Sequence, residues 1–248
     1  MLKTEKLISE LQTFFQNCGF TRAVVGLSGG IDSAVTLAVA VRALGAKNVT
    51  GILLPDSEVS SSESEILAKK VAVQFDVQTY TFELAPTLAT LNFEWGSFLL
   101  AEQNIRPRLR MLALYHFART HNALVLGTSN RSEILLGYGT KFGDFAADVE
   151  VIGDFWKTEV YQLALEFTIP SEIINRSPTA ELQVGVTDEH ELGANYATID
   201  PILQKIVAGE SRFSGDSGVL EKRIYERVLA NSHKTKLPPV LGQQLKIN

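Results

Sequence analysis

The feature that most constrains this chain is the stretch VVGLSGGIDSAVTLAVAV, residues 24–41, in which one apolar run passes through a short polar loop into another. The first run is typical of a buried strand that ends at Leu27, and the second predicts a helix that begins near residue 32 or 33. Gly29 and Gly30 lie between them, where glycine permits positive φ angles without steric cost. A strand, a tight loop and a helix in this order predict a parallel α/β sheet.

Short β-rich segments alternate with longer helical segments along the chain. Strands are expected at residues 21–27, 49–55, 77–84 and 123–128. An amphipathic helix opens the chain, and Ser62 and Glu65 are expected to form a capping box at the start of a later helix. This alternation predicts an α/β fold, a doubly wound and mainly parallel sheet with helices on both faces. The chain contains no internal repeat and no clear linker, so we expect a single domain over residues 1–248.

The polar loop carries groups that suit a phosphate ligand. Glycine lets the backbone N–H groups approach one anion, and the following helix adds the partial positive charge of its N-terminus. Ser28 and Ser33 supply hydroxyl donors, and Asp32 supplies a carboxylate for a magnesium ion beside the phosphates. The loop lacks the Gly-Lys-Ser/Thr ending of a common phosphate-binding loop and the third spaced glycine of a dinucleotide fingerprint. The alternative is a tight turn that binds nothing.

Composition excludes several classes of protein. Lys and Arg number 23 against 28 Asp and Glu, a net charge of -5, so a nucleic-acid-coating surface is not expected. The single cysteine, Cys18, excludes a disulfide framework within the chain and is expected to be a small buried side chain. No signal core and no run of eighteen apolar residues is present, so we expect a cytoplasmic protein with no membrane partner.

With these residues in view, SGGIDS resembles the loop of the N-type ATP pyrophosphatases, which cleave ATP between its α- and β-phosphates. Within that group the chain is similar to the ammonia-dependent NAD synthetases over nearly its whole length. The similar motifs are RPRLRMLALY, LVLGTSNRSEILLGYGTKFGD, FWKTEV, SPTAEL, TDEHELG, YATIDPIL and HKTKLPP. The resemblance implies an adenine nucleotide alpha hydrolase-like fold. It also implies amidation of nicotinic acid adenine dinucleotide (deamido-NAD) with ammonia and ATP, through an adenylated carboxylate, to give NAD, AMP and pyrophosphate.

The resemblance also implies roles for individual residues. The metal ligands for Mg²⁺ would be Asp32 and Glu133. The residues that would contact ATP are Gly26, Leu27, Ser28, Gly29, Gly30, Ile31, Asp32, Ser33, Thr128, Lys157 and Thr179. The residues that would contact deamido-NAD are Arg108, Lys141, Asp148, His233 and Lys234. The family is homodimeric, which predicts a homodimer here.

Ordinary structural roles remain alternatives for several of these residues. Without the resemblance, Lys157 is a surface or capping lysine and Glu133 a solvated glutamate near a helix start. Arg106 and Arg110 share one helix face and Arg108 lies on another, which is compatible with a separate task for Arg108.

The chain departs from the family at two places. Pro107 stands where relatives often carry a small residue, and it constrains the residue before it. The segment LLPDSEVSS lacks the arginine that some relatives place near ATP, so we assign no adenine or ribose contact.

Two other functions compete with this hypothesis. A tRNA-thiolating ATP pyrophosphatase is disfavoured by the single cysteine and the acidic net charge. A non-catalytic adenine-nucleotide-binding module would need the loop but not the two carboxylates and the dinucleotide contacts. Free ammonia is the expected nitrogen source, and a separate glutaminase subunit that supplies it stays open as an alternative.

Overall fold

The computed structural model describes residues 3–96, 98–177, 188–210 and 217–239. Its centre is one sheet of five parallel strands in the order β3-β2-β1-β4-β5. The strands are β1 (Arg22–Leu27), β2 (Val49–Leu53), β3 (Gln78–Thr81), β4 (Ala123–Gly127) and β5 (Val149–Glu150). The predicted parallel α/β sheet is therefore confirmed. The chain runs outward from β1 to β3 and then returns to place β4 on the other side of β1.

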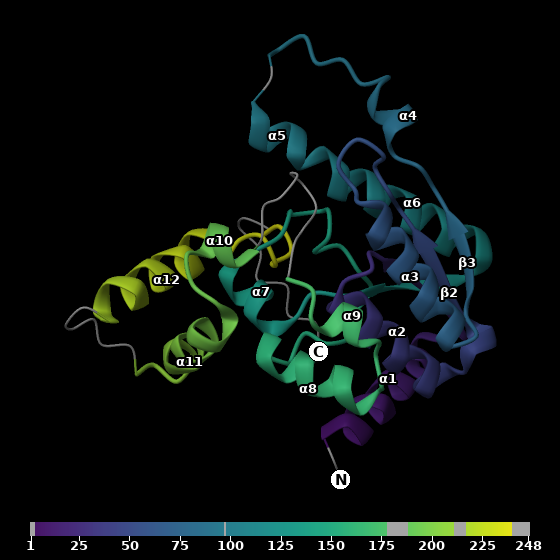
Figure 1. Cartoon of the computed structure of the whole chain (residues 1–248), viewed down its shortest axis with the longest axis horizontal. Helices are drawn as coiled ribbons and strands as arrows, with labels where there is room; N and C mark the ends of the chain where they lie inside the picture. Colours follow the sequence, from purple (N-terminus) through teal and green to yellow (C-terminus); the bar gives the residue numbers. More distant parts are fainter. Residues whose placement is uncertain (1–2, 97, 178–187, 211–216, 240–248) are drawn as a thin grey trace.

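The helices follow and separate these strands (Figure 1). In chain order they are α1 (Lys3–Cys18), α2 (Ile31–Leu44), the 3-10 turn η1 (Ala46–Asn48), α3 (Ser62–Gln74), α4 (Ala85–Leu88), α5 (Leu99–Gln103), α6 (Ile105–His121), α7 (Arg131–Leu136), α8 (Lys157–Glu166), α9 (Ser171–Ile174), α10 (Asp188–Leu192), α11 (Tyr196–Val207) and α12 (Ser217–Asn231). Within the part of the chain that is described, no helix is both long and apolar enough to cross a membrane.

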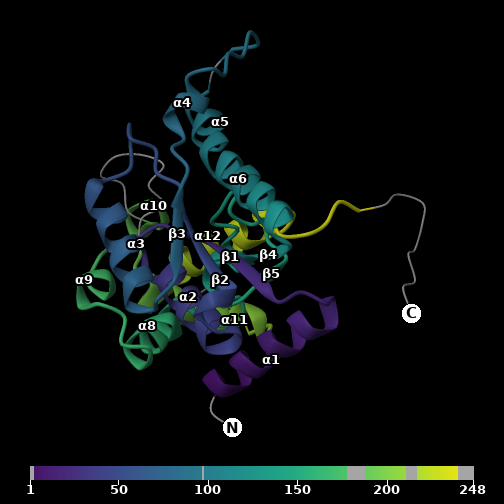
Figure 2. The same cartoon turned by 90° about the vertical axis from the view of Figure 1, so that its right-hand side faces the viewer.

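Helices cover both faces of the sheet, as the sequence predicts. Alternate residues of β1 enter different hydrophobic clusters, because successive strand side chains point to opposite faces. Val25 packs with α1, α2, α3 and α8, whereas Val24 packs with α6. Figure 2 shows the strands between α3 on one side and α6 on the other.

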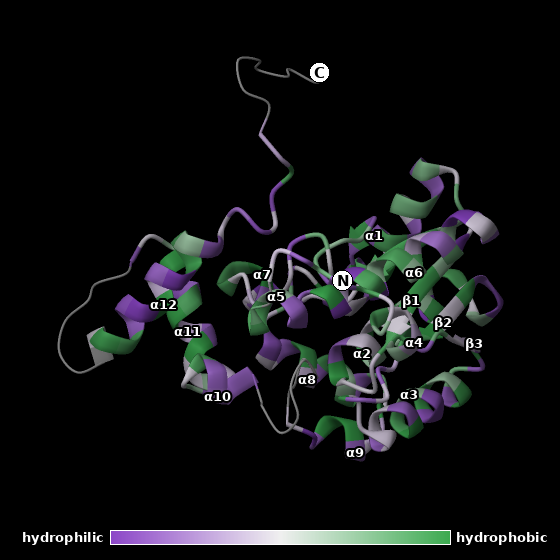
Figure 3. Cartoon of the chain, turned by 90° about the horizontal axis from the view of Figure 1, so that it is seen from above, coloured by the Kyte–Doolittle hydropathy of each residue, from purple (hydrophilic) through white to green (hydrophobic). Residues whose placement is uncertain are grey.

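A second group of helices, α10 to α12, lies beside the sheet rather than over it (Figures 1 and 3). The buried side chains of this group, among them Leu192, Ile199 and Ile224, form a cluster of their own with Leu136 of α7 and Trp156. Turns coloured hydrophobic and hydrophilic alternate along α3 and α12 in Figure 3, as expected for helices with one buried face. This group closes one end of the cavity described below.

Several sequence predictions of local structure need correction. The predicted third strand is shortened to β3, and the two-residue strand β5 was not predicted because two residues show no periodicity. The capping box predicted for Ser62 and Glu65 is wrong: Ser61 is the N-cap of α3, and its hydroxyl accepts from the Ser64 N–H. Cys18 is exposed and not buried: it continues the spacing of the buried residues Leu11 and Phe15, but it is the last residue of α1.

Candidate active site

A cavity of about 680 Å³ opens at the carboxyl ends of β1, β2 and β4. This volume falls in the usual range for small-molecule sites, about 300–1,000 Å³. The sheet order reverses between β1 and β4, and ligands of doubly wound sheets bind at such a reversal. The lining includes the predicted residues Gly26, Leu27, Ser28, Gly30, Ile31, Asp32, Ser33, Thr128, Glu133, Lys157 and Lys234.

Hydrogen bonds of the Ser33 hydroxyl fix the conformation of the loop between β1 and α2. The Ser33 hydroxyl donates to the Gly30 carbonyl at 3.0 Å and accepts from the Ser28 N–H at 3.3 Å. The first helical bond of α2 runs from the Ala34 N–H to the Gly30 carbonyl, so the amides of residues 31–33 have no helical partner. Amides without a partner at a helix N-terminus are suited to bind an anion, as the sequence predicts for this loop.

Only one of the paired glycines has the predicted positive φ angle. Gly29 has φ +77°, whereas Gly30 is the extended N-cap of α2 with φ -91°. A Cβ atom on Gly29 would lie 2.3 Å from the Ser64 carbonyl oxygen, so only glycine fits between the loop and α3. The helix begins at Ile31, one residue before the predicted start.

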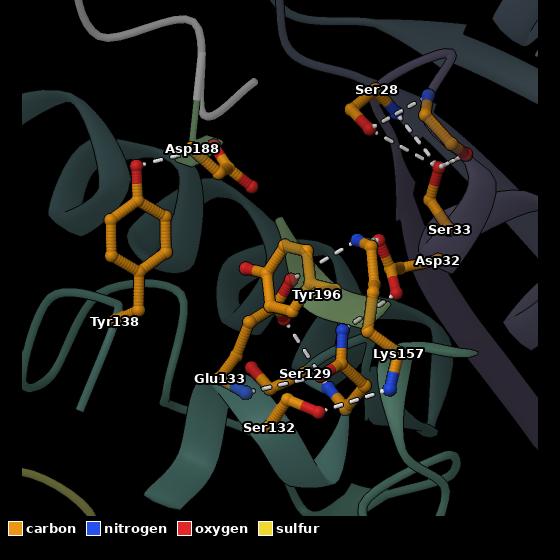
Figure 4. A network of polar contacts seen from close by, with 12 residues as sticks. Ser28, Asp32, Ser33, Ser129, Ser132, Glu133, Tyr138, Lys157, Asp188 and Tyr196 are labelled. Carbon is orange, nitrogen blue, oxygen red and sulfur yellow. Dashed lines mark hydrogen bonds and ion pairs between the residues drawn. The ribbon is translucent and has the colours of Figure 1, made fainter. Parts of the chain in front are cut away.

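Lys157 joins the two predicted metal ligands (Figure 4). Its Nζ atom lies 2.5 Å from Asp32 Oδ2 and 3.3 Å from Glu133 Oε1. The side chains of Asp32 and Glu133 are largely buried, and Lys157 is 1% exposed. The alternative of a surface lysine is therefore wrong. Asp32 follows β1 and Glu133 follows the neighbouring strand β4, so the parallel sheet brings together side chains that are far apart in the sequence.

Burial and charge shift the acid–base behaviour of this group. Burial, and after it the charge of Asp32, raise the pKa of Glu133 to about 8 against the opposing effect of Lys157. Burial lowers the pKa of Lys157, but the two carboxylates more than reverse this and raise its pKa above the usual value. Two desolvated carboxylates that face one another favour a cation between them. Their oxygen atoms suit Mg²⁺, which typically takes one or two carboxylates and completes its shell with phosphate oxygens and water.

Asn130 completes this arrangement and was missed by the sequence analysis. Its Nδ2 donates to Asp32 Oδ1 at 2.9 Å, and its Oδ1 accepts from the Glu133 N–H at 3.0 Å. It is the N-cap of α7 and forms a capping box with Glu133. The spacing Asn-Arg-Ser-Glu carries this signal in the sequence. Asn130 therefore ties the loop after β4 to the start of α2.

The remaining wall of the cavity brings further polar side chains that no sequence pattern singled out. Asp188 is buried, which raises its pKa to about 6 against the lowering effect of Lys157. The Tyr138 hydroxyl donates to Asp188 Oδ1 at 3.2 Å and also to Glu191. Arg227 of α12 stands over the Tyr138 ring, 5.5 Å from its centre. Asp188 and Glu191 lie in the motif TDEHELG, and Tyr138 lies in LVLGTSNRSEILLGYGTKFGD, but no role is predicted for them from the sequence.

The residues predicted to contact deamido-NAD are only partly brought together. Lys234 lines the cavity, and its Nζ donates to the carbonyls of Gly137 and Gly139. Beside it, Lys141 Nζ donates to the His233 carbonyl at 3.0 Å, and the exposed Arg108 donates to the Lys141 carbonyl at 3.4 Å.

Asp148 lies apart from these residues, where β4 meets β5. It is exposed and accepts from the Val125 N–H at 2.7 Å. Thr128 borders the cavity after β4, and Thr179 lies outside the described residues.

The predicted division among the three arginines of α6 is confirmed. Arg106 pairs with the buried Asp56 at 2.5 Å, and Arg110 donates to the Leu54 carbonyl at 3.1 Å. Both therefore hold α6 to the segment after β2, while Arg108 points to another side. Pro107 is accommodated in the first turn of α6, where its missing N–H breaks no helical bond.

Comparison with known proteins agrees with this geometry. A profile of the family described as NAD synthase matches residues 3–238. The NH(3)-dependent NAD(+) synthetase of Methanococcoides burtonii is 39% identical over 242 residues, which cover 94% of this chain and 92% of that protein. Two solved structures are each 30% identical to this chain. NMN synthetase from Francisella tularensis has a TM-score of 0.85 and covers 97% of each chain. The NH3-dependent NAD synthetase from Campylobacter jejuni has a TM-score of 0.80, covering 96% of this chain and 97% of that one. The chain belongs to the NAD synthase family.

Proposed function

We propose that this protein uses ATP to amidate the nicotinate carboxylate of deamido-NAD with ammonia, giving NAD, AMP and pyrophosphate. The observation that carries the proposal is the buried Lys157 between Asp32 and Glu133, beside the phosphate loop and within the cavity. A simple nucleotide-binding module has no need for such a group. The names of the Methanococcoides burtonii and Campylobacter jejuni relatives support the same activity.

The first step activates the carboxylate. A nicotinate carboxylate oxygen attacks the α-phosphorus of ATP, the bond to the β-phosphate oxygen breaks, and pyrophosphate leaves. The loop amides bind phosphate oxygens, and the Lys157 ammonium stabilises the charge that develops on the leaving group. Asp32 and Glu133 would hold Mg²⁺, which when bound neutralises phosphate charge.

The second step forms the amide. Ammonia attacks the activated carbonyl carbon, the bond from that carbon to the AMP oxygen breaks, and a proton is released. The residues of the cavity mainly position the reactants, because AMP is already a good leaving group. The name of the Methanococcoides burtonii relative, NH(3)-dependent NAD(+) synthetase, supports ammonia as the direct substrate.

A second candidate substrate is the shorter nicotinate mononucleotide in place of the dinucleotide deamido-NAD. The relative from Francisella tularensis carries the name NMN synthetase, and its TM-score exceeds that of the Campylobacter jejuni protein. The same two steps on nicotinic acid mononucleotide would give NMN. Arg108, Lys141 and His233 form a chain of contacts that ends next to Lys234, which lines the cavity. This placement favours the longer dinucleotide, because the cationic Arg108 and Lys141 are left for a second nucleotide half.

One experiment separates these reactions. Pyrophosphate release and nicotinamide products are measured with ATP and magnesium, with each nicotinate substrate and ammonium added or omitted. NAD formed only when deamido-NAD and ammonium are both present supports the proposal. A higher kcat/KM for the mononucleotide would replace deamido-NAD by that substrate, and no pyrophosphate under any combination would contradict both candidates.

The proposal includes a homodimer. Apolar side chains stand exposed on and before α5 and on α6, with Trp95 84%, Phe98 69% and Leu112 59% exposed. Apolar surface of this kind marks contact sites. Leu100, also exposed, lines the cavity, so this surface continues into the site. Leu112→Asp is expected to give a monomeric mass in light scattering, whereas the parent gives a dimer. A monomeric parent would contradict the homodimer.

The proposed setting of the reaction is the cytoplasm, where ATP is consumed in biosynthesis, without a nucleic-acid or membrane partner. Whether a separate glutaminase delivers ammonia is tested by comparing glutamine and ammonium as nitrogen sources in cell extract and with the purified protein. If glutamine supports NAD formation in cell extract but not with the purified protein, such a subunit is present.

A further inference from the structure

Asp200 is a buried carboxylate with an unusual set of donors. It lies on α11, in the motif YATIDPIL, and is 1% exposed. Its Oδ1 accepts from the Ser132 hydroxyl at 2.6 Å. Its Oδ2 accepts from both the N–H and the hydroxyl of Thr158, at 2.9 and 2.7 Å. A buried charge is stable only when hydrogen bonds replace its water, and three donors do so here.

These bonds lead to Lys157. The Ser132 hydroxyl donates to Asp200. It also accepts from the N–H of Lys157 at 3.0 Å (Figure 4). Asp200 thus binds the first two residues of α8, Thr158 directly and Lys157 through Ser132. A carboxylate at the positive end of a helix is also favourable.

The same bonds fix α7. Ser132 is the residue before Glu133, so Asp200 anchors the helix that presents one carboxylate and the helix that presents the ammonium. Asp200 is absent from the cavity lining, and therefore acts through these neighbours. Any rotation of α8 relative to α7 would change the distances from Lys157 Nζ to Glu133 and Asp32, now 3.3 and 2.5 Å.

We propose that Asp200 is a positioning residue: through Ser132 and Thr158 it sets the place of Lys157 between the two carboxylates. This inference rests on the proposed function, because it assigns the catalytic charge to Lys157. Fixing a charged group by rigid secondary structure before the reaction avoids reorganisation during it.

Two variants and one control test the proposal. Asp200→Asn keeps the shape of the side chain but replaces one accepting oxygen by an NH2 group, which cannot accept from Ser132 or Thr158. Ser132→Ala removes the hydroxyl that links Asp200 to the Lys157 N–H. Thr4→Val is the matched control, since the buried Thr4 hydroxyl donates to Glu166 at 2.7 Å at the opposite end of α8. Turnover is measured per folded molecule, at a temperature where circular dichroism shows every variant folded, and melting temperature is measured separately.

Both site variants are expected to lower kcat by about tenfold to a hundredfold, since small displacements of reacting groups have such effects. The KM for deamido-NAD is expected to change by less than about twofold, as for an interaction that acts in the transition state. Thr4→Val is expected to lower the melting temperature and leave kcat unchanged. A lower melting temperature with parental kcat in Asp200→Asn and Ser132→Ala would show a purely structural role and overturn the proposal.

A crystal structure of each site variant gives a readout independent of turnover. The Lys157 Nζ is expected to leave at least one carboxylate, beyond the ion-pair limit of about 4 Å. An unmoved Lys157 would overturn the inference even if the parent proved inactive. An inactive parent with a displaced Lys157 would instead contradict the proposed function alone. If Asp200→Asn does not fold, Ser132→Ala carries both measurements.

Discussion

Gly29→Ala is expected to damage ATP use much more than it damages the fold. The new Cβ would lie 2.3 Å from the Ser64 carbonyl oxygen, whereas ordinary contact begins at 3.4 Å. The loop and α3 must therefore separate by 1.1 Å, the difference between these distances. A displacement of about 1 Å in a positioning element can cost about a hundredfold in rate. The positive φ angle adds about 1–2 kcal/mol of backbone strain.

The control is Gly19→Ala. Gly19 has a similar φ angle of +71°, and a Cβ there meets nothing within 4 Å. The backbone strain by itself is expected to lower the melting temperature of each variant by about 2–8 °C, at about 2–4 °C per kcal/mol for a chain of this size. Only Gly29→Ala is expected to lose about a hundredfold in kcat/KM for ATP, followed by pyrophosphate release. Parental kcat/KM in Gly29→Ala, or an equal loss in Gly19→Ala, would refute the reasoning.

Three further outcomes follow from the charged groups. Lys157→Met leaves two buried carboxylates facing each other, so turnover should fall by at least about a hundredfold and magnesium should raise the melting temperature more than in the parent; an equal rise would contradict this. Burial raises the pKa of Glu150 to about 7, against the opposing effect of a backbone N–H. Because the pKa of Glu150 in the folded protein lies above its unfolded value of 4.5, protonated Glu150 contributes to the free energy of unfolding. This contribution is fully present below pH 4.5 and is lost as pH rises through about 7. Glu150→Gln should therefore flatten the decline of melting temperature between about pH 5 and 8, and an unchanged decline would contradict it. Arg106→Ala should cost about 3–5 kcal/mol, since it leaves Asp56 buried without its cation, whereas Arg108→Ala should spare stability and raise the KM for deamido-NAD. Equal melting temperatures of the two arginine variants would argue against this division.

The sequence predicts those parts of the fold that have a local signal. The apolar runs before residue 28 and before residue 128 predict two central strands, and the spacing of Arg106, Arg108 and Arg110 predicts their division of roles. Local signals fail where an element is short, as with β5, or where neighbouring serines compete for one cap, as at Ser61 and Ser62.

For the candidate site, prediction from the sequence is limited by contacts between residues that are far apart along the chain. Nothing around Lys157 marks it as buried, because its partners come from the loop after β1 and from α7, far away in the sequence. Only the resemblance to a family selected it. Asp200 shows the same limit more strongly: an aspartate inside an amphipathic helix gives no sign that it caps another helix. Contacts of this kind are determined by tertiary packing.

The exposed Cys18 at the end of α1 has a practical consequence. It is the one thiol of the chain, so a maleimide dye attaches at a single defined position without mutagenesis. It is also absent from the residues lining the cavity. In air, two such thiols on different molecules can join as a disulfide and give the mass of a covalent pair. A reducing agent therefore distinguishes a dimer held by apolar contacts from one formed by oxidation during storage.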